Sequence, residues 1–209
     1  MEIGFEINLE NIDDDSTPMI TPSEVIEHIF CPRYTYFLNC LDIDQNEHLR
    51  YKVLKGREIH ERREKTNFDY LRKRMNCVKK EIAVYLASKK YRVRGVVDEV
   101  LWLGDRTLAP LDYKYTEYSD FTFKTHKIQS VIYALLIRDN YSAEVNRGYI
   151  CYVRNGNKLK EIVYSEKDFF EALSLINEIF EIIKKGYFPP KTKYDARCID
   201  CCYRNICPK

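Results

Sequence analysis

Half of the cysteines in this chain are concentrated at its C-terminal end. Four of the eight lie within the last twelve residues: Cys198, Cys201, Cys202 and Cys207. This segment is too short and too polar to form a core of its own. The N-terminus, with Glu2, Glu6 and Glu10, lacks the basic start and apolar stretch of a secretory signal, so we expect a cytoplasmic protein in which disulfides are rare. The crowded thiols are therefore expected to be metal ligands or buried free thiols, and any fold has to supply one of these environments.

Length and charge distribution favour one folded domain with an anionic partner. A chain of 209 residues with 45% hydrophobic and 32% charged residues builds one substantial core, and no run of 18 apolar residues predicts a membrane span. The first twenty residues carry six acidic and no basic residues, and we treat them as a tail. Two basic stretches, residues 50–80 and 184–209, suit a phosphate-rich ligand, although a solvated helix face is the alternative.

Helical and strand patterns in succession predict an α/β or α+β fold. Residues 21–24 form a capping box for a helix that breaks at Cys31, and Asn155-Gly156 is a strong hairpin turn signal. Gly186 is expected to end the last helix. The expected elements are, in chain order, helical stretches at 21–30 and 34–38, a charged helical region at 50–75, strands at 81–86, 91–103 and 108–115, a helix at 124–138, strands at 148–154 and 158–164, and a helix at 166–185.

Two aspartates interrupt otherwise apolar strands. A strand interior disfavours aspartate, and a buried carboxylate is costly unless it is paired or bound to a metal. If the strands of Asp98 and Asp112 are neighbours, their carboxylates converge on one Mg²⁺ or Mn²⁺ ion. Lys114 shares a strand face with Asp112, so its ammonium group would orient a nucleophile or stabilise developing charge. The alternative is that Asp98 is a surface residue of an edge strand and that Asp112 and Lys114 are a chance match.

Three further side chains are candidates for the same site. Gln129 and Tyr133 are four residues apart on the helix after the third strand, so they share a face that could reach the active edge of the sheet. A structural amide and a core tyrosine are the more ordinary explanation. His60 lies in the charged helical region, where a lone histidine is usually solvated, yet histidine is also the commonest nitrogen ligand for metals.

The order of these residues resembles the motifs of RecB-type nucleases in the PD-(D/E)xK superfamily. The matching segments are Gly-Arg-Glu-Ile-His60, Gly-Val-Val-Asp98, Asp112-Tyr113-Lys114 and Gln129-Ser-Val-Ile-Tyr133. With Cys31 and the late cysteines, residues 21–209 resemble the CRISPR-associated exonuclease family, the fourth of the numbered Cas families. The resemblance implies a restriction-endonuclease-like core, in which helices flank a central mixed sheet.

Roles for individual residues follow from this resemblance. The implied metal ligands are His60, Asp98, Asp112 and the backbone carbonyl of Tyr113. Lys114 would be catalytic, and Gln129 and Tyr133 would position the substrate or Lys114. Many relatives have glutamate where this chain has Asp112, a difference that should alter the geometry without removing a ligand.

The resemblance also implies an iron-sulfur cluster, most often [4Fe-4S], that joins the N-terminal helices to the C-terminal segment. Its ligands would be Cys31, Cys198, Cys201 and Cys207. A structural zinc ion is the alternative because zinc also accepts four thiolates, and Cys202 could replace Cys201. The other cysteines are assigned to packing: Cys40, Cys77 and Cys151.

The expected function is a metal-dependent DNA exonuclease that trims single-stranded ends for CRISPR spacer acquisition in antiviral defence. Its expected partners are DNA and the CRISPR integrase complex, without a membrane, and a homo-oligomer remains open. A RecB-like nuclease of recombination or repair is one alternative, and a non-catalytic, zinc-stabilised DNA-binding or scaffold protein is another. The expected organisation is an acidic tail at 1–20 and one nuclease domain at 21–209, divided into a helical region at 21–75, a nuclease core at 78–186 and a cysteine segment at 187–209.

Contacts with single-stranded DNA are expected from basic and aromatic side chains near the site. Arg57, Arg62 and Arg63 flank His60 and would follow the phosphate backbone. Aromatic residues gather just after the third strand, where exposed rings could stack on unpaired bases, although most of them are expected to be core: Tyr113, Tyr115, Tyr118, Phe121 and Phe123.

Overall fold

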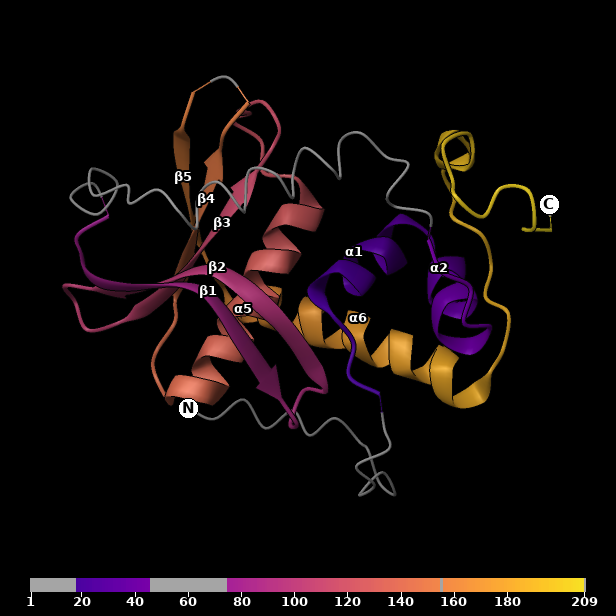
Figure 1. Ribbon diagram of the computed structural model, residues 1–209, viewed down its shortest axis with the longest axis horizontal. Helices are drawn as coiled ribbons and strands as arrows, with labels where there is room; N and C mark the ends of the chain where they lie inside the picture. Colours follow the sequence, from indigo (N-terminus) through magenta and orange to yellow (C-terminus); the bar gives the residue numbers. More distant parts are fainter. Residues whose placement is uncertain (1–17, 46–74, 155, 209) are drawn as a thin grey trace.

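A computed structural model describes residues 18–45, 75–154 and 156–208 (Figure 1). Most of the acidic tail and residues 50–74 of the charged region lie outside the described residues. The same holds for four of the site candidates: Arg57, His60, Arg62 and Arg63. No helix within the described ranges is long and apolar enough to cross a membrane.

A five-stranded mixed sheet forms the centre of the fold. Its strands are β1 (Cys77–Ser88), β2 (Val93–Leu103), β3 (Leu108–Lys114), β4 (Arg147–Tyr152) and β5 (Lys158–Val163), and they lie side by side in chain order. Only the β3–β4 pair is parallel, because the helix α5 (Lys124–Tyr141) crosses over between these two strands. The predicted mixed sheet with flanking helices is therefore confirmed, and all five strands occur where the sequence pattern placed them.

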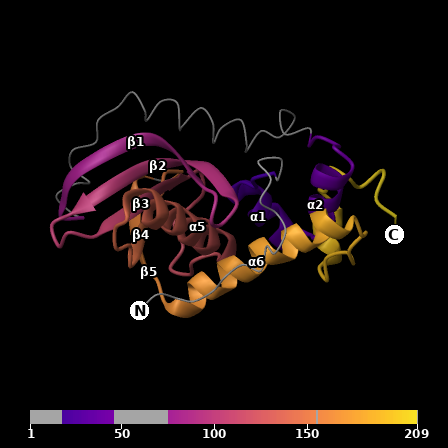
Figure 2. The ribbon, with the colours of Figure 1, turned by 90° about the horizontal axis from the view of Figure 1, so that it is seen from below.

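Helices cover one face of this sheet and extend beyond it. They are α1 (Pro22–Phe30), α2 (Arg33–Thr35), the π-helical turn η1 (Tyr36–Cys40), α5 and α6 (Glu166–Lys185). Helix α1 packs against both α5 and α6. Figure 2 shows α6 running from below the sheet to α2 and the C-terminal segment, so this one helix connects the sheet with the cysteine-rich end of the molecule.

Local sequence signals account for where the helices begin and end. Thr21 and Glu24 form the predicted capping box of α1, with the Thr21 backbone N–H donating to Glu24 Oε2 over 2.7 Å. A second capping box joins Ser165 to Asp168 at the start of α6. Gly186 ends α6 with φ +60°, a left-handed conformation that suits glycine.

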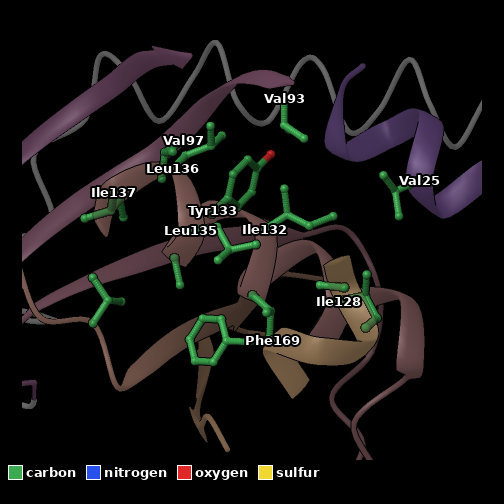
Figure 3. Packing of buried hydrophobic residues seen from close by; sticks show 14 of the residues in the cluster. Val25, Val93, Val97, Ile128, Ile132, Tyr133, Leu135, Leu136, Ile137 and Phe169 are labelled. Atoms are coloured by element: carbon green, nitrogen blue, oxygen red, sulfur yellow. The ribbon is translucent and has the colours of Figure 1, made fainter. Parts of the chain in front are cut away.

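The main hydrophobic core fills the space between the sheet and the helices. Figure 3 shows Tyr133, Ile132 and Leu136 of α5 packed against Val93 and Val97 of β2. Ile20 is fully buried in this core and bridges to Val93, so the packed fold begins within the segment that the sequence suggested was a tail. The opposite face of the sheet carries a second buried cluster, which includes Cys151.

Candidate functional site

The candidate catalytic residues gather where β2 and β3 separate. These strands pair from Glu99 with Leu111 to Trp102 with Leu108, and their pairing ends at Glu99. Immediately beyond it, Asp98 Oδ2 accepts a hydrogen bond from the backbone N–H of Tyr113 over 2.8 Å. A side chain thus replaces a backbone partner at the fork, and the Asp98 carboxylate lies beside β3.

An irregularity in β1 and β2 turns Asp98 toward β3. Val97 and Val100 are three residues apart, yet both lie in the core beneath α5, which regular alternation of a strand does not allow. Ala83 faces this position on β1 and has a left-handed φ of +53°, and the strand pairs on either side leave Ala83 and Asp98 out. The register is the same on both sides, so one residue of each strand leaves the ladder here and no residue is added.

Asp112 and Lys114 form the second half of the site. Asp112 is only 1% exposed, and its Oδ2 lies 2.6 Å from Lys114 Nζ, so the two side chains share one face as the strand period predicts. Lys114 Nζ also donates to Gln129 Oε1 on α5. The amide of Gln129 in turn donates to Tyr133 Oη over 3.2 Å. One ion pair and two hydrogen bonds therefore connect Asp112 on β3 with α5.

Tyr133 remains a neutral phenol in this arrangement. Burial raises its pKa far above the ordinary value, and the nearby carboxylates of Asp112 and Asp98 raise it further. A tyrosine of this kind acts through hydrogen bonds, because its hydroxyl does not ionise near neutral pH. Its position supports the orientation of Gln129, and through Gln129 that of Lys114.

The structure brings together five of the residues that the sequence nominated for catalysis: Asp98, Asp112, Lys114, Gln129 and Tyr133. The proposed metal ligand His60 lies outside the described residues. Tyr113, whose backbone carbonyl was nominated as a ligand, belongs to the same segment of β3. Its hydroxyl points away from the site and donates to Glu99 Oε1 over 2.8 Å.

The donor set suits a hard divalent cation. Asp98 and Asp112 supply carboxylate oxygens from adjacent strands, and these are the ligands that Mg²⁺ and Mn²⁺ prefer. Around the two aspartates, the described ranges place no third His, Cys, Asp or Glu side chain close enough to complete a site for a metal ion. The two aspartates therefore account for part of a coordination shell, and the remaining ligands would come from elsewhere in the chain, from water or from substrate.

Sequence reasoning missed two groups beside Lys114. His126 precedes Gln129 by three residues and Tyr133 by seven, so the three side chains form one row along α5. Tyr152 is the β4 partner of Lys114. The helical spacing could have indicated His126, whereas Tyr152 becomes apparent only when β3 and β4 are placed in register.

Exposed aromatic rings lie in the segment between β3 and α5. Phe121 is 70% and Phe123 46% exposed, whereas Tyr113 is buried and cannot stack on a base. Tyr118 is partly exposed and lies beneath the ammonium groups of Lys158 and Lys160, which are 5.4 and 5.8 Å from its ring centre. Aromatic and cationic groups therefore meet at the segment that follows Lys114.

A separate cavity of about 310 Å³ lies between the N-terminal helices and the C-terminal segment. Its lining includes four cysteines: Cys31, Cys198, Cys201 and Cys207. Cys202 is not part of this lining. Four cations also line the cavity, against the single carboxylate of Asp195: Arg33, Lys191, Arg197 and Arg204. Thiolate ligands carry negative charge, so this surplus of cations suits a group that is held by four thiolates.

The N-terminal helices and the C-terminal segment are also joined without the thiols. Tyr203 stacks on Phe37 with 4.7 Å between ring centres, and its hydroxyl donates to the carbonyl of Ile43 over 2.7 Å. Arg197 donates to the carbonyls of Ile29 and Phe30 at the end of α1 over 2.9 and 2.8 Å. These contacts hold the C-terminal cysteines near Cys31.

Comparisons relate the chain to known proteins. Residues 37–208 match the PD-(D/E)XK nuclease superfamily. The chain is 25% identical over 191 residues to the CRISPR-associated exonuclease Cas4 of Aeropyrum pernix, an alignment that covers 87% of this chain and 90% of the relative. A crystal structure from Eubacterium rectale, assigned as an exonuclease, aligns with a TM-score of 0.43 at 15% identity and covers 90% of this chain and 75% of that one.

Proposed function

Because the chain belongs to the PD-(D/E)XK nuclease superfamily, we propose that it is a divalent-metal-dependent DNA exonuclease that acts on single-stranded ends or overhangs. The observation that carries this proposal is the convergence of Asp98, Asp112 and Lys114 where β2 and β3 separate. A catalytically silent scaffold would not need a buried carboxylate and a lysine held in place by Gln129.

The metal would be bound by Asp98 and Asp112, together with His60 and the backbone carbonyl of Tyr113. When it is bound, Mg²⁺ or Mn²⁺ supplies charge neutralisation at the phosphodiester and lowers the pKa of a bound water. Asp112 serves a second purpose, since its carboxylate also fixes the ammonium group of Lys114. The hydroxyl of Tyr113 donates to Glu99 and therefore takes no part in metal binding.

Lys114 would act on the reacting phosphodiester. Its ammonium group contacts Asp112 and Gln129, so it is held in one orientation beside the site where the phosphate binds. From there it can hydrogen-bond the attacking water or a phosphate oxygen and stabilise the negative charge that develops there. Gln129 and Tyr133 are positioning residues in this scheme, because they act through Lys114.

Single-stranded DNA is the proposed substrate because exposed rings lie in the segment that directly follows Lys114. Phe121, Phe123 and Tyr118 can stack on unpaired bases, and Lys158 and Lys160 can attract the backbone. Arg57, Arg62 and Arg63 are proposed to add phosphate contacts. The name of the Aeropyrum pernix relative supports a role in trimming DNA for CRISPR spacer acquisition, with the CRISPR integrase complex as partner. Recombination or repair is the alternative role.

The cavity between the N-terminal helices and the C-terminal segment is proposed to hold a [4Fe-4S] cluster through Cys31, Cys198, Cys201 and Cys207. Four cysteines line one space large enough for a group of several atoms, and cations surround it. Zinc is the alternative occupant. We propose that the protein works in the cytoplasm, where reducing conditions keep these thiols available. We also propose that residues 21–209 form one nuclease domain, to whose core Ile20, at the end of the acidic segment 1–20, contributes a buried side chain.

The proposed activity is tested by cleavage of end-labelled DNA in the presence of Mn²⁺ or Mg²⁺. We expect linear single strands and overhangs to be degraded faster than blunt duplex, EDTA to stop the reaction, and Lys114→Ala to be inactive. Binding by Lys114→Ala should weaken steeply between two salt concentrations, because phosphate contacts release counterions. Equal binding to blunt duplex, or cleavage of circular single strands, would contradict the proposed substrate.

A further inference from the structure

Two buried polar atoms near Lys114 have no hydrogen-bond partner among the residues that the structure describes. They are the hydroxyl oxygen of Tyr152 and Nδ1 of His126. Tyr152 is only 1% exposed, so its hydroxyl cannot compensate for the missing partner with a hydrogen bond to bulk water. Buried polar groups are nearly always paired, and an unpaired one in a native structure calls for an explanation such as a missing ligand.

Both residues belong to the active edge of the sheet. Tyr152 on β4 pairs in register with Lys114 on β3, and neighbouring residues in register share a face of the sheet. The ring of His126 lies 6.0 Å from the ring of Tyr152, between centres. His126 continues the row of Gln129 and Tyr133 by one turn toward the start of α5. Tyr152 and His126 thus extend the catalytic group on the side of the α5 N-terminus.

The charge state of His126 fits a neutral hydrogen-bonding role. Burial lowers its pKa to about 4, and the positive charge of Lys114 contributes in the same direction. At neutral pH the imidazole is therefore uncharged and carries one N–H group. In the tautomer that is protonated at Nδ1, this buried nitrogen donates a hydrogen bond.

The start of α5 adds backbone donors to the same place. Phe123 is the N-cap residue, and its side chain offers no oxygen to the N–H groups of the first turn. Uncapped N–H groups and the positive end of the helix dipole favour an anion, most commonly a phosphate. His126 lies within this first turn, so the backbone donors and the two unpartnered side chains adjoin one another.

We propose that Tyr152, His126 and the first-turn N–H groups of α5 form a phosphate-binding subsite for the DNA phosphate next to the one that is cleaved. This inference rests on the proposed nuclease function. The cleaved phosphate would lie beside the two carboxylates and Lys114. The adjacent phosphate of the same strand would then accept hydrogen bonds from Tyr152, His126 and the first-turn N–H groups of α5. The subsite binds substrate through neutral donors and leaves the charge of Lys114 to the reaction.

Two conservative variants separate this role from packing. Tyr152→Phe removes only the hydroxyl, and His126→Phe keeps an aromatic ring between Phe123 and Tyr152. If the rings only fill space, loss of an unpaired buried polar group leaves activity unchanged and keeps or raises the melting temperature. If they bind phosphate, each variant raises KM for single-stranded DNA by about threefold to tenfold, with kcat nearly unchanged and no fall in melting temperature.

Tyr164→Phe is the matched control. The Tyr164 hydroxyl is also buried but is paired with both the side chain and the backbone carbonyl of Ser130. Its removal should lower the melting temperature and leave KM at the wild-type value. Opposite effects on stability and on substrate binding in Tyr152→Phe and Tyr164→Phe would support the subsite.

A chemical change in the DNA identifies the group that is bound. A single-stranded oligonucleotide with one methylphosphonate next to the cleaved bond should bind about threefold to tenfold more weakly to Lys114→Ala protein than the unmodified strand. It should lose no further affinity when Tyr152→Phe is added, because both changes remove the same hydrogen bond.

Unchanged DNA affinity when Tyr152→Phe or His126→Phe is added to Lys114→Ala would overturn the subsite. Independent, additive losses from the methylphosphonate and from Tyr152→Phe would overturn it as well. These binding measurements do not depend on cleavage. A wild-type protein that binds DNA but does not cleave it with Mn²⁺ would refute the proposed nuclease function, while the affinities would still decide the subsite.

Discussion

Arg33 donates a hydrogen bond from Nη1 to Sγ of Cys207 over 3.2 Å, which joins residues 174 positions apart in the sequence. The same guanidinium group donates from Nε to the carbonyl of Pro189 over 3.1 Å and lies 4.4 Å above the ring centre of Phe188. Arg33 therefore neutralises a proposed thiolate ligand and at the same time holds two parts of the C-terminal segment against α2.

Replacement of Arg33 should weaken retention of the cofactor. Arg33→Leu removes these hydrogen bonds and the positive charge beside Cys207, and hydrogen bonds to charged groups contribute about 1.5–3 kcal/mol. We expect less iron and sulfide per chain after desalting and a lower melting temperature. Arg204→Leu is the control, because Arg204 lines the cavity but donates to the backbone carbonyl of Ile199. An equal loss of cofactor in both variants would contradict the assigned role.

The cavity distinguishes Cys201 from Cys202 as a ligand. We expect Cys31→Ser and Cys201→Ser to lose the cofactor, and Cys202→Ser to keep it, because only the first two residues line the cavity. Protein purified without oxygen should be brown and contain iron and inorganic sulfide, as measured by its visible spectrum and elemental analysis. Colourless protein with stoichiometric zinc would show that the site is a zinc site.

The charged residues at the fork between β2 and β3 should be essential for cleavage and dispensable for folding. Asp98→Asn keeps an oxygen that can accept from the N–H of Tyr113 but removes the charge, and Lys114→Ala removes the ammonium group. We expect each variant to lose at least about a hundredfold in kcat while its melting temperature stays near that of the wild type. Substantial activity of Asp98→Asn with Mn²⁺ would place the metal elsewhere.

Gly148 on β4 has no room for a side chain. A Cβ atom at this position would collide with the Tyr164 hydroxyl and lie 2.6 Å from Ser130 Oγ, inside the buried hydrogen-bonded pair that joins α5 to the end of β5. We therefore expect Gly148→Ala to lower the free energy of unfolding by about 1–3 kcal/mol. Urea unfolding measures this loss, and an unchanged midpoint would show that the pair rearranges at little cost.

Stability should fall in mild acid because of His28. Burial lowers the pKa of His28 below its ordinary value of 6.5, against an opposing effect of Glu178, so folding favours the neutral ring. The unfolded chain then takes up a proton more readily, and the contribution present above about pH 6.5 is lost as the pH falls through the folded pKa. Melting temperatures from pH 8 to pH 5 should decline less steeply in His28→Gln. Parallel curves would exclude His28 as a source of the pH dependence.

Much of the architecture is local in origin and was predictable for that reason. The capping box at Thr21 and Glu24, the left-handed glycine at Gly186 and the strand-forming residues of β1 to β5 depend on residues close together in the chain. The strand period also places Asp112 and Lys114 on one face, as the structure confirms. These features follow from backbone geometry, which neighbouring residues largely determine.

Other features depend on which segments become neighbours. Sequence alone nominated Asp98, but only the separation of β2 from β3 directs its carboxylate to the N–H of Tyr113. Tyr152 became a candidate because it pairs in register with Lys114. Cys201 could be distinguished from Cys202 as a ligand because only Cys201 lines the cavity between the N-terminal helices and the C-terminal segment. Local sequence accounts for the elements and for the chemical groups that are available. Tertiary structure alone decided which of these groups meet, because strand pairing and burial join residues that local geometry leaves independent.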